Sequence, residues 1–191
     1  MQARLALLPL CLSCALAFAQ GYPKAEVFAG YSFTSIDQNS GPRANANGFE
    51  LSASGNLNER FALETAFSGY YQQLRDNGGP AGSFSYMAGP RFNLVRKHRS
   101  VSPLFVHFLL GFQHLIGSDF GNSVSDTAIA VAMGGGLEWR FSTRLSLRSS
   151  VDYALTHYFI TQNNVRMSVG VAYAFGGASK KTGLRHDSIN R

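Results

Sequence analysis

Hydrophobic and polar side chains alternate with a period of two along most of the chain. Val169 and Val171, for example, alternate with Ser168 and Gly170. The same alternation recurs in eight segments, at residues 26–33, 49–54, 61–71, 83–92, 104–112, 128–139, 145–155 and 165–175. Because successive side chains of a strand point to opposite faces, each segment predicts a β-strand with one apolar face. With their ends included, the eight strands should have roughly 9–12 residues each, the length that a tilted strand needs to cross a bilayer.

The connections between these segments differ in length. Long polar connections are expected near 35–46, 73–82, 114–126 and 157–163, and shorter ones near 56–59, 95–102 and 141–143. An outer-membrane barrel has long external loops and short periplasmic turns. The order of segments therefore fits an all-β, up-and-down meander of eight antiparallel strands with both chain ends on the periplasmic side.

The composition of the polar face decides which face points outward. Charged residues make up only 15% of the chain, against about 25% in average globular proteins. The polar face consists of Ser, Ala and Gly with few charges and almost no Lys, whereas a solvated surface normally carries many Lys and Glu. Small side chains suit the crowded interior of an eight-stranded barrel. Aromatic residues near the strand ends resemble interfacial girdles, namely Tyr31, Phe33, Tyr71, Phe84, Trp139 and Phe175. The pattern favours a transmembrane β-barrel over a soluble barrel or sandwich.

The first residues have the pattern of a secretory signal peptide. Arg4 precedes a short apolar run that ends in an A-x-A cleavage pattern at Ala19. The expected division is a signal peptide at 1–19, a barrel at 20–176 and a short basic, solvated periplasmic tail at 177–191. Both cysteines, Cys11 and Cys14, fall within the leader, so the mature chain should contain no disulfide. After residue 20 no apolar run reaches the roughly 18 residues of a helical span.

Several short motifs resemble those of a known family. They are GGGLE at 134–138, RLSLR at 144–148, VDY at 151–153, QNNVR at 162–166 and AGPRF at 88–92. Over residues 22–176 the chain resembles the small bacterial outer-membrane β-barrel proteins of the OmpA membrane-domain and OmpX-like group. The resemblance implies the bacterial outer membrane as the location and outer-membrane lipids as the surroundings. The ending Tyr173-Ala174-Phe175 is similar to the signal that the outer-membrane assembly machinery recognises, although sixteen residues follow it. Pro90 falls inside a predicted strand, where it removes a ladder hydrogen bond and leaves the local register open.

Charged residues also occur on the predicted inner face. They are Glu50, Glu64, Arg91, Glu138, Arg148, Asp152 and Arg166. Isolated buried charges are costly, so these side chains should pair inside the narrow bore. The expected result is a salt-bridged plug that fixes the register and closes the lumen. The alternative is a gate whose pairs rearrange and admit small ions, because eight strands leave no room for a wide pore.

Catalysis is not expected from this sequence. His157 lies beside a predicted loop without a His-x-Ser pattern, and His107 faces the bore with no matching Ser on its strand. The five histidines show no paired metal spacing, so neither a metal nor a cofactor is expected. The net charge is +6, but the aromatic residues belong to the lipid-facing belt, which argues against nucleic-acid binding.

The sequence therefore predicts a monomeric, non-enzymatic outer-membrane barrel. Its expected role is structural or surface interaction, with an extracellular ligand contacted through the loops at 36–46 and 117–125. The alternative function is a narrow channel for ions or small solutes.

Overall fold

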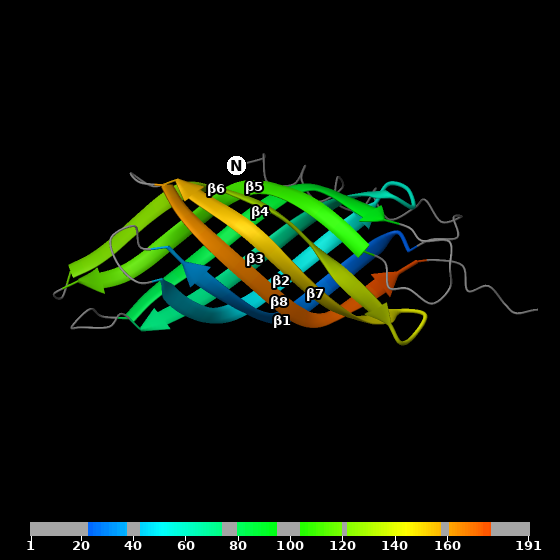
Figure 1. Ribbon diagram of the computed structural model, residues 1–191, viewed down its shortest axis with the longest axis horizontal. Coiled ribbons are helices and arrows are strands. Elements are labelled where there is room, and N and C mark those ends of the chain that lie inside the picture. The colour runs from blue at the N-terminus through cyan, green and yellow to red at the C-terminus, as the bar shows by residue number, and fades with distance from the viewer. Residues whose placement is uncertain are drawn as a thin grey trace, which may run out of the picture.

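The computed structural model describes residues 23–37, 43–73, 80–94, 104–119, 122–157 and 161–176. The expected leader at 1–19 and tail at 177–191 lie outside the described residues. The described chain forms eight strands, β1 (Ala25–Ile36), β2 (Ala44–Asn56), β3 (Phe61–Gln73), β4 (Pro80–Leu94), β5 (Leu104–Asp119), β6 (Asn122–Arg140), β7 (Leu145–His157) and β8 (Thr161–Phe175). They pair in sequence order as a closed barrel (Figure 1), which confirms the predicted fold class.

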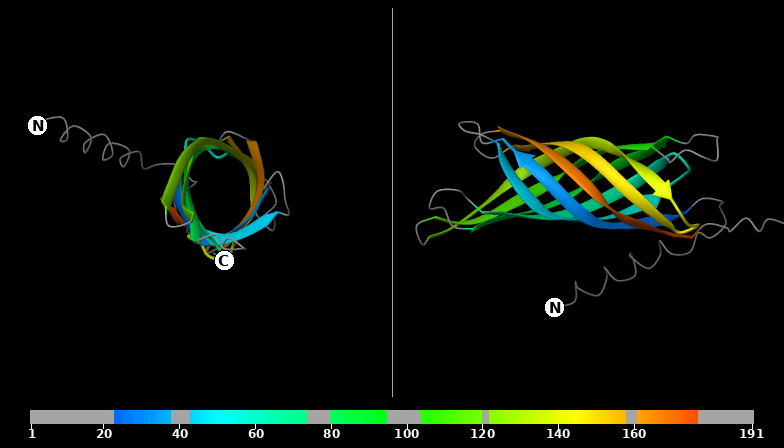
Figure 2. Two further views of the ribbon diagram at one scale, coloured as in Figure 1. Left: turned by 90° about the vertical axis from the view of Figure 1, so that its left-hand side faces the viewer. Right: turned by 60° about the horizontal axis from the view of Figure 1, so that its bottom comes forward.

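All neighbouring strands are antiparallel, and β1 closes the barrel by pairing with β8. Gly30 on β1 lies opposite Gly170 on β8 at this seam. Viewed along its axis, the barrel is a continuous ring without a free side (Figure 2). The end where β1 begins and β8 ends is called the termini end, and the opposite end is called the loop end.

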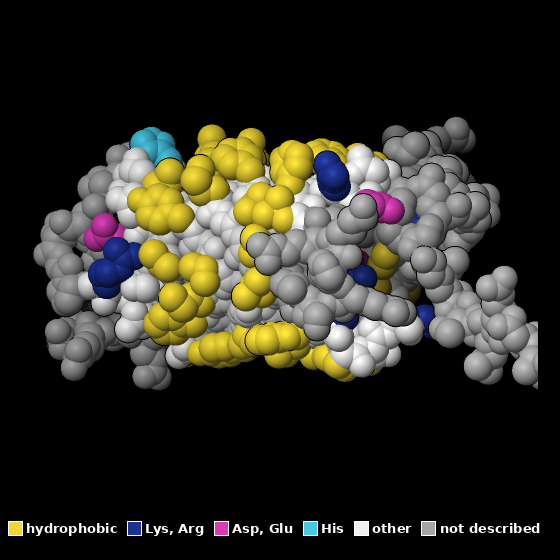
Figure 3. All heavy atoms as spheres, turned by 45° about the vertical axis from the view of Figure 1, so that its right-hand side comes forward, with side chains coloured by type: hydrophobic (Ala, Val, Ile, Leu, Met, Phe, Trp, Pro, Cys, Tyr) yellow, Lys and Arg dark blue, Asp and Glu magenta, His cyan; other side chains and the backbone are white. Residues whose placement is uncertain are grey.

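The outer wall of the barrel is apolar. Leu110, Met133 and Val151 are about half exposed on this wall, and hydrophobic side chains cover much of it in the view of Figure 3. The neighbouring positions in each strand point inward and are buried, as Ser150 and Asp152 are on either side of Val151. This arrangement is the reverse of a soluble barrel and matches a wall that faces lipid. No described helix is long and apolar enough to span a membrane.

The strands are longer than the expected 9–12 residues. They contain between 12 and 19 residues, and the longest pair is β5 and β6. The segment at 114–126, expected to be a loop, is mostly strand, because β5 and β6 stay paired as far as Asp119 and Asn122. This segment is rich in Gly, Ser, Asn and Asp, which strands usually disfavour. Pairing with a neighbouring strand overrides that local preference.

Pro90 does not shift the register of its strand. On one side it lies opposite Leu63 of β3. On the other side the pairs Ala88–Leu110 and Arg91–His107 continue one register, and only Gly89 and Pro90 lack a paired residue on β5. Proline has no N–H to donate, so the ladder is interrupted for two residues and then resumes.

Candidate functional site

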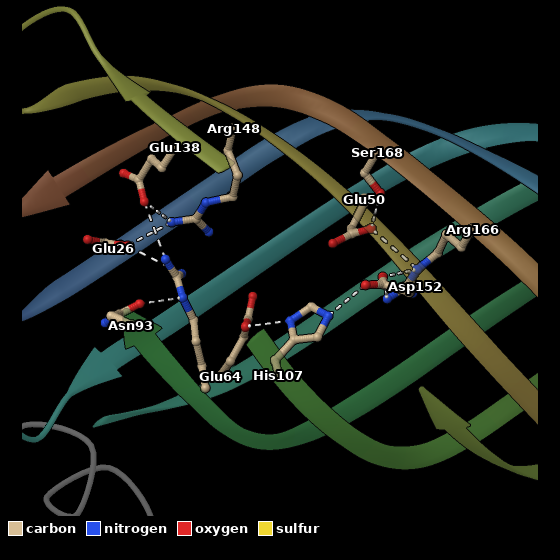
Figure 4. A network of polar contacts seen from close by, with 11 residues as sticks. Glu26, Glu50, Glu64, Asn93, His107, Glu138, Arg148, Asp152, Arg166 and Ser168 are labelled. Carbon is tan, nitrogen blue, oxygen red and sulfur yellow. Dashed lines mark hydrogen bonds and ion pairs between the residues drawn. The ribbon is translucent and has the colours of Figure 1, made fainter. Parts of the chain in front are cut away.

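The seven charged residues predicted for the inner face all lie inside the barrel. Their exposed fractions are at most 4%. The structure brings them together in two groups of polar contacts (Figure 4), one near the termini end and one nearer the middle. The seven residues are Glu50, Glu64, Arg91, Glu138, Arg148, Asp152 and Arg166.

The termini-end cluster joins four strands across the bore. Arg148 Nη2 donates to Glu26 Oε2 at 2.7 Å and to Glu138 Oε2 at 3.3 Å. Arg91 reaches the same two carboxylates, at 3.4 Å from Glu26 and 3.3 Å from Glu138. The Ser146 hydroxyl donates a further hydrogen bond to Glu138. Two guanidinium groups and two carboxylates thus form one closed set of ion pairs.

Aromatic rings support this cluster. The Arg91 guanidinium carbon lies 4.2 Å from the centre of the Phe105 ring, and that of Arg148 lies 5.4 Å from the same ring and 5.5 Å from Phe28. A cation over an aromatic face is attracted by the ring quadrupole. At the rim, Arg140 extends toward Glu26 at 3.4 Å and Glu138 at 3.9 Å.

The central cluster is a chain of contacts with His107 in the middle. His107 Nδ1 lies 3.0 Å from Glu64 Oε2, and Nε2 lies 2.7 Å from Asp152 Oδ1. A neutral imidazole has one N–H, but both nitrogens face carboxylate oxygens, so the geometry fits a doubly protonated ring. Arg166 Nε and Nη2 donate to Asp152 Oδ2 at 2.8 Å and 2.6 Å.

Glu50 extends this chain toward β1 and β3. Arg166 Nε lies 3.7 Å from Glu50, and the Ser168 hydroxyl donates to Glu50 Oε2 at 2.6 Å. Ser168, Ser32 and the Tyr70 hydroxyl follow in hydrogen-bond contact. Contacts therefore link β5, β7, β8, β2, β1 and β3 around the inside of the barrel.

Two buried members of these clusters, Glu26 and His107, are missing from the predicted network, as is Arg140 at the rim. Alternation places both on the polar face, but Glu26 stands at the beginning of its strand and His107 between Val106 and Phe108 in an otherwise apolar segment. With them, five buried carboxylates face three buried guanidinium groups, a protonated His107 and the rim residue Arg140. The five negative charges are then balanced by five positive charges. Counting every charged residue on the inner face of the sequence, including those at the strand ends, would have identified the missing members.

The arrangement is suited to structural pairing. Both ring nitrogens of His107 are occupied by carboxylates, so this ring is not placed to activate a hydroxyl nucleophile. Within the described ranges, no group of three or more His, Cys, Asp and Glu side chains could hold a metal ion. A cavity of about 20 Å³ lies on the loop-end side of Arg166 and is lined by Tyr70, Gln113 and Thr156. This volume suits one water molecule.

Solved structures with a similar fold are outer-membrane proteins. Neisserial surface protein A is 14% identical with a TM-score of 0.69, and the match covers 82% of this chain and 100% of that chain. Ail, the attachment invasion locus protein of Yersinia pestis, is 19% identical with a TM-score of 0.61 and coverages of 80% and 99%. The N-terminal β-barrel domain of Pseudomonas aeruginosa OprF is 13% identical with a TM-score of 0.56 and coverages of 80% and 98%.

At these identities, the likeness to solved structures shows the fold alone. No curated protein matches this chain in sequence. The family is shown by the sequence itself, because the family model described as outer membrane protein beta-barrel domain matches residues 5–175. The chain therefore belongs to the outer membrane protein beta-barrel domain family, and its place is the bacterial outer membrane.

Proposed function

We propose that this protein is a non-enzymatic barrel that presents a polypeptide-binding edge outside the cell, while its interior ion pairs keep the bore closed. The observation that carries the proposal is the unequal length of the strands at the loop end. β5 and β6 remain paired as far as Asp119 and Asn122, but the pairing of β6 with β7 stops at Ile129 and His157. Figure 1 shows the two strands projecting beyond their neighbours at the left.

The projecting part of β6 supports binding by strand addition. On its β7 side, no described strand pairs with residues 122–128. An open strand edge offers backbone N–H and C=O groups to another extended chain. Leu115 and Ile116 on the paired part of β5 are both exposed, at 36% and 45%. A partner strand would thus find backbone hydrogen bonds at the edge of β6, with exposed apolar side chains one strand further away on β5.

Charge at the loop end favours a polypeptide over a polyanion. Ail has been crystallised in complex with the heparin analogue sucrose octasulfate. The described loop end of this chain carries Asp37 and Asp126 as well as Arg43. Arg43 already donates to the Ser35 hydroxyl and to two backbone carbonyls. A sulfated ligand would meet little excess positive charge there.

The edge can be tested at Ser125 with a matched pair of variants. The Thr127 N–H donates to the Asp126 carboxylate at 2.8 Å. This bond is consistent with a Thr127 backbone N–H that points away from β5. Backbone N–H groups two residues apart in a strand point to the same side, so the Ser125 N–H also points away from β5. Ser125→Pro removes an edge donor, whereas Ser125→Ala keeps it.

The experiment selects extended peptides from a displayed random library on the protein in lipid nanodiscs. Selected peptides should bind the wild type and Ser125→Ala equally and Ser125→Pro at least about tenfold more weakly, the effect of roughly one lost hydrogen bond. Equal binding to all three proteins, or no selected peptide, would contradict the edge as the binding surface. Steady ion current through the wild type in planar bilayers would instead favour the narrow channel.

A further inference from the structure

Two turns at the termini end have the same construction. The first turn, residues 57–60, joins β2 to β3, and the second, residues 141–144, joins β6 to β7. Each begins with an apolar residue and ends with an arginine, in the sequences LNER and FSTR. The two turns can therefore be compared position by position.

The backbone hydrogen bonds of the two turns correspond one to one. In the first turn, the N–H groups of Leu57 and Asn58 both donate to the carbonyl of Phe61. In the second turn, the N–H groups of Phe141 and Ser142 both donate to the carbonyl of Leu145. These bonds are between 2.9 and 3.3 Å long.

The arginine of each turn is anchored to the next strand by its own backbone. The Arg60 carbonyl accepts from the Asn93 N–H at 2.7 Å, and the Arg144 carbonyl accepts from the Ala174 N–H at 2.8 Å. The backbone of each arginine is therefore held at the rim of the barrel.

The apolar residue of each turn is unusually exposed. Leu57 is 60% exposed and Phe141 is 65% exposed. Each lies next to an aromatic pair on the outer wall, Phe61–Phe92 beside the first turn and Tyr173–Phe175 beside the second. Apolar and aromatic side chains at the end of a lipid-facing wall belong to the interface between acyl chains and head groups.

The two turns differ in charge. Glu59 precedes Arg60 in the first turn, which makes that turn neutral, whereas the second turn contains no acidic residue. Arg144 Nη1 donates to the Tyr173 hydroxyl at 3.4 Å. Among the described residues, no carboxylate pairs with Arg144. This differs from Arg140, four residues earlier, which contacts Glu26 and Glu138.

We propose that the 141–144 turn is a binding site for the head group of an anionic phospholipid. Arg144 holds the phosphate, and Phe141 and Trp139 lie among the adjoining acyl chains. The head group of a zwitterionic lipid also carries a positively charged amine, and this turn has no carboxylate that could pair with it. The site therefore favours a head group with net negative charge. The first turn lies four strands away in either direction around the ring, on the opposite side of the barrel. Because Glu59 is present there, that turn does not share the preference.

Trp139 makes the proposal directly testable. It is the only tryptophan of the sequence, it is 66% exposed, and it stands two residues before Phe141. The mature protein is refolded into phosphatidylcholine vesicles with a small fraction of either brominated phosphatidylglycerol or brominated phosphatidylcholine. Bromine quenches tryptophan on contact, so the ratio of the two quenching constants measures lipid preference beside this turn.

The expected preference of the wild type for phosphatidylglycerol is about fivefold, the effect of one basic residue near an anionic surface. Arg144→Gln should reduce the ratio to about one, and Arg144→Lys should keep most of it. Arg60→Gln is the matched control on the opposite side of the ring and should leave the ratio unchanged. High salt should weaken the preference because it screens exposed charges.

A wild-type ratio of one would overturn the proposal, as would an unchanged ratio in Arg144→Gln. An equal loss in Arg60→Gln would also overturn it, because the effect would then be a general attraction of a basic protein. If Arg144→Gln does not insert into the vesicles, the ratio of quenching constants of the wild type and its dependence on salt still test the proposal.

Discussion

Gly134 on β6 lies directly opposite Asp152 on β7, and the Asp152 carboxylate occupies the space where a side chain at Gly134 would lie. A Cβ at this position would collide with Asp152 Oδ1 and with the Val151 carbonyl. Gly136, two residues further, makes room for the Phe105 ring in the same way. The glycine run at 134–136 therefore shapes the space in which both ion-pair clusters form.

We expect Gly134→Ala to destabilise the barrel. The added methyl group must displace Asp152, which contacts both His107 and Arg166, and overpacking of a filled interior costs roughly 1–3 kcal/mol. Urea unfolding of the protein in lipid vesicles measures the change. Gly55→Ala is the control, because a Cβ there meets no atom within 4 Å. Equal stability of the two variants would show that the Asp152 position is not constrained by Gly134.

We expect Arg148→Ala to cost about 3–5 kcal/mol of unfolding free energy, because it leaves the carboxylates of Glu26 and Glu138 with fewer buried partners. The double variant Arg148→Ala with Glu26→Gln should recover part of this loss, because Arg91 and Glu138 remain as a pair. Arg166→Ala should behave in the same way toward Asp152 and Glu50. A double variant no more stable than Arg148→Ala alone would contradict the pairing. Unfolding in lipid vesicles gives all these values.

The bore should open when a cation is removed. Wild-type protein in planar bilayers should show little or no single-channel current, and Arg148→Ala or Arg166→Ala should raise it, because each change removes a large side chain from the narrow interior. Val151→Ala, on the lipid-facing side of β7, is the matched control and should remain non-conducting. Variants that conduct no more than the wild type would mean that these arginines do not obstruct the bore.

The lipid-facing wall can be tested at two adjacent residues of β8. Val169 is 47% exposed on the outer wall, and Ser168 is 5% exposed inside. Val169→Arg should cost about 2–4 kcal/mol if this residue lies near the bilayer midplane. Labelled cysteines at the two positions should differ in quenching by brominated lipid, with strong quenching only at 169. Equal quenching at 168 and 169 would refute the assigned faces.

The leader remains a prediction, since residues 1–19 lie outside the described residues. Cleavage after Ala19 should give a mature chain that begins at Gln20 and contains no thiol. Mass spectrometry of the outer-membrane fraction measures the mature mass. A lipidated chain that begins at Cys14 would contradict both the cleavage site and the absence of a lipid anchor.

The alternation and composition of the chain were enough to predict the barrel, its strand order and its two faces. Alternation is a local property, and the choice of Ser, Ala and Gly for one face together with aromatic residues for the other identifies which side meets lipid. The same alternation placed Glu50, Arg166 and the other five predicted charged residues on the inner face of the barrel. Local composition failed at 114–126, where Gly, Ser and Asn predict a loop and pairing between β5 and β6 produces a strand.

Which charged side chains meet depends on the three-dimensional arrangement of the strands. Glu26 and Arg148 are 122 residues apart in the chain, and their contact depends on the closure of the barrel and on the stagger of its strands. His107 joins the network because Glu64 and Asp152 approach it from strands on either side, a relationship that no local pattern contains. Alternation fixes whether a side chain points inward, and the register of the closed sheet fixes its depth and its partner.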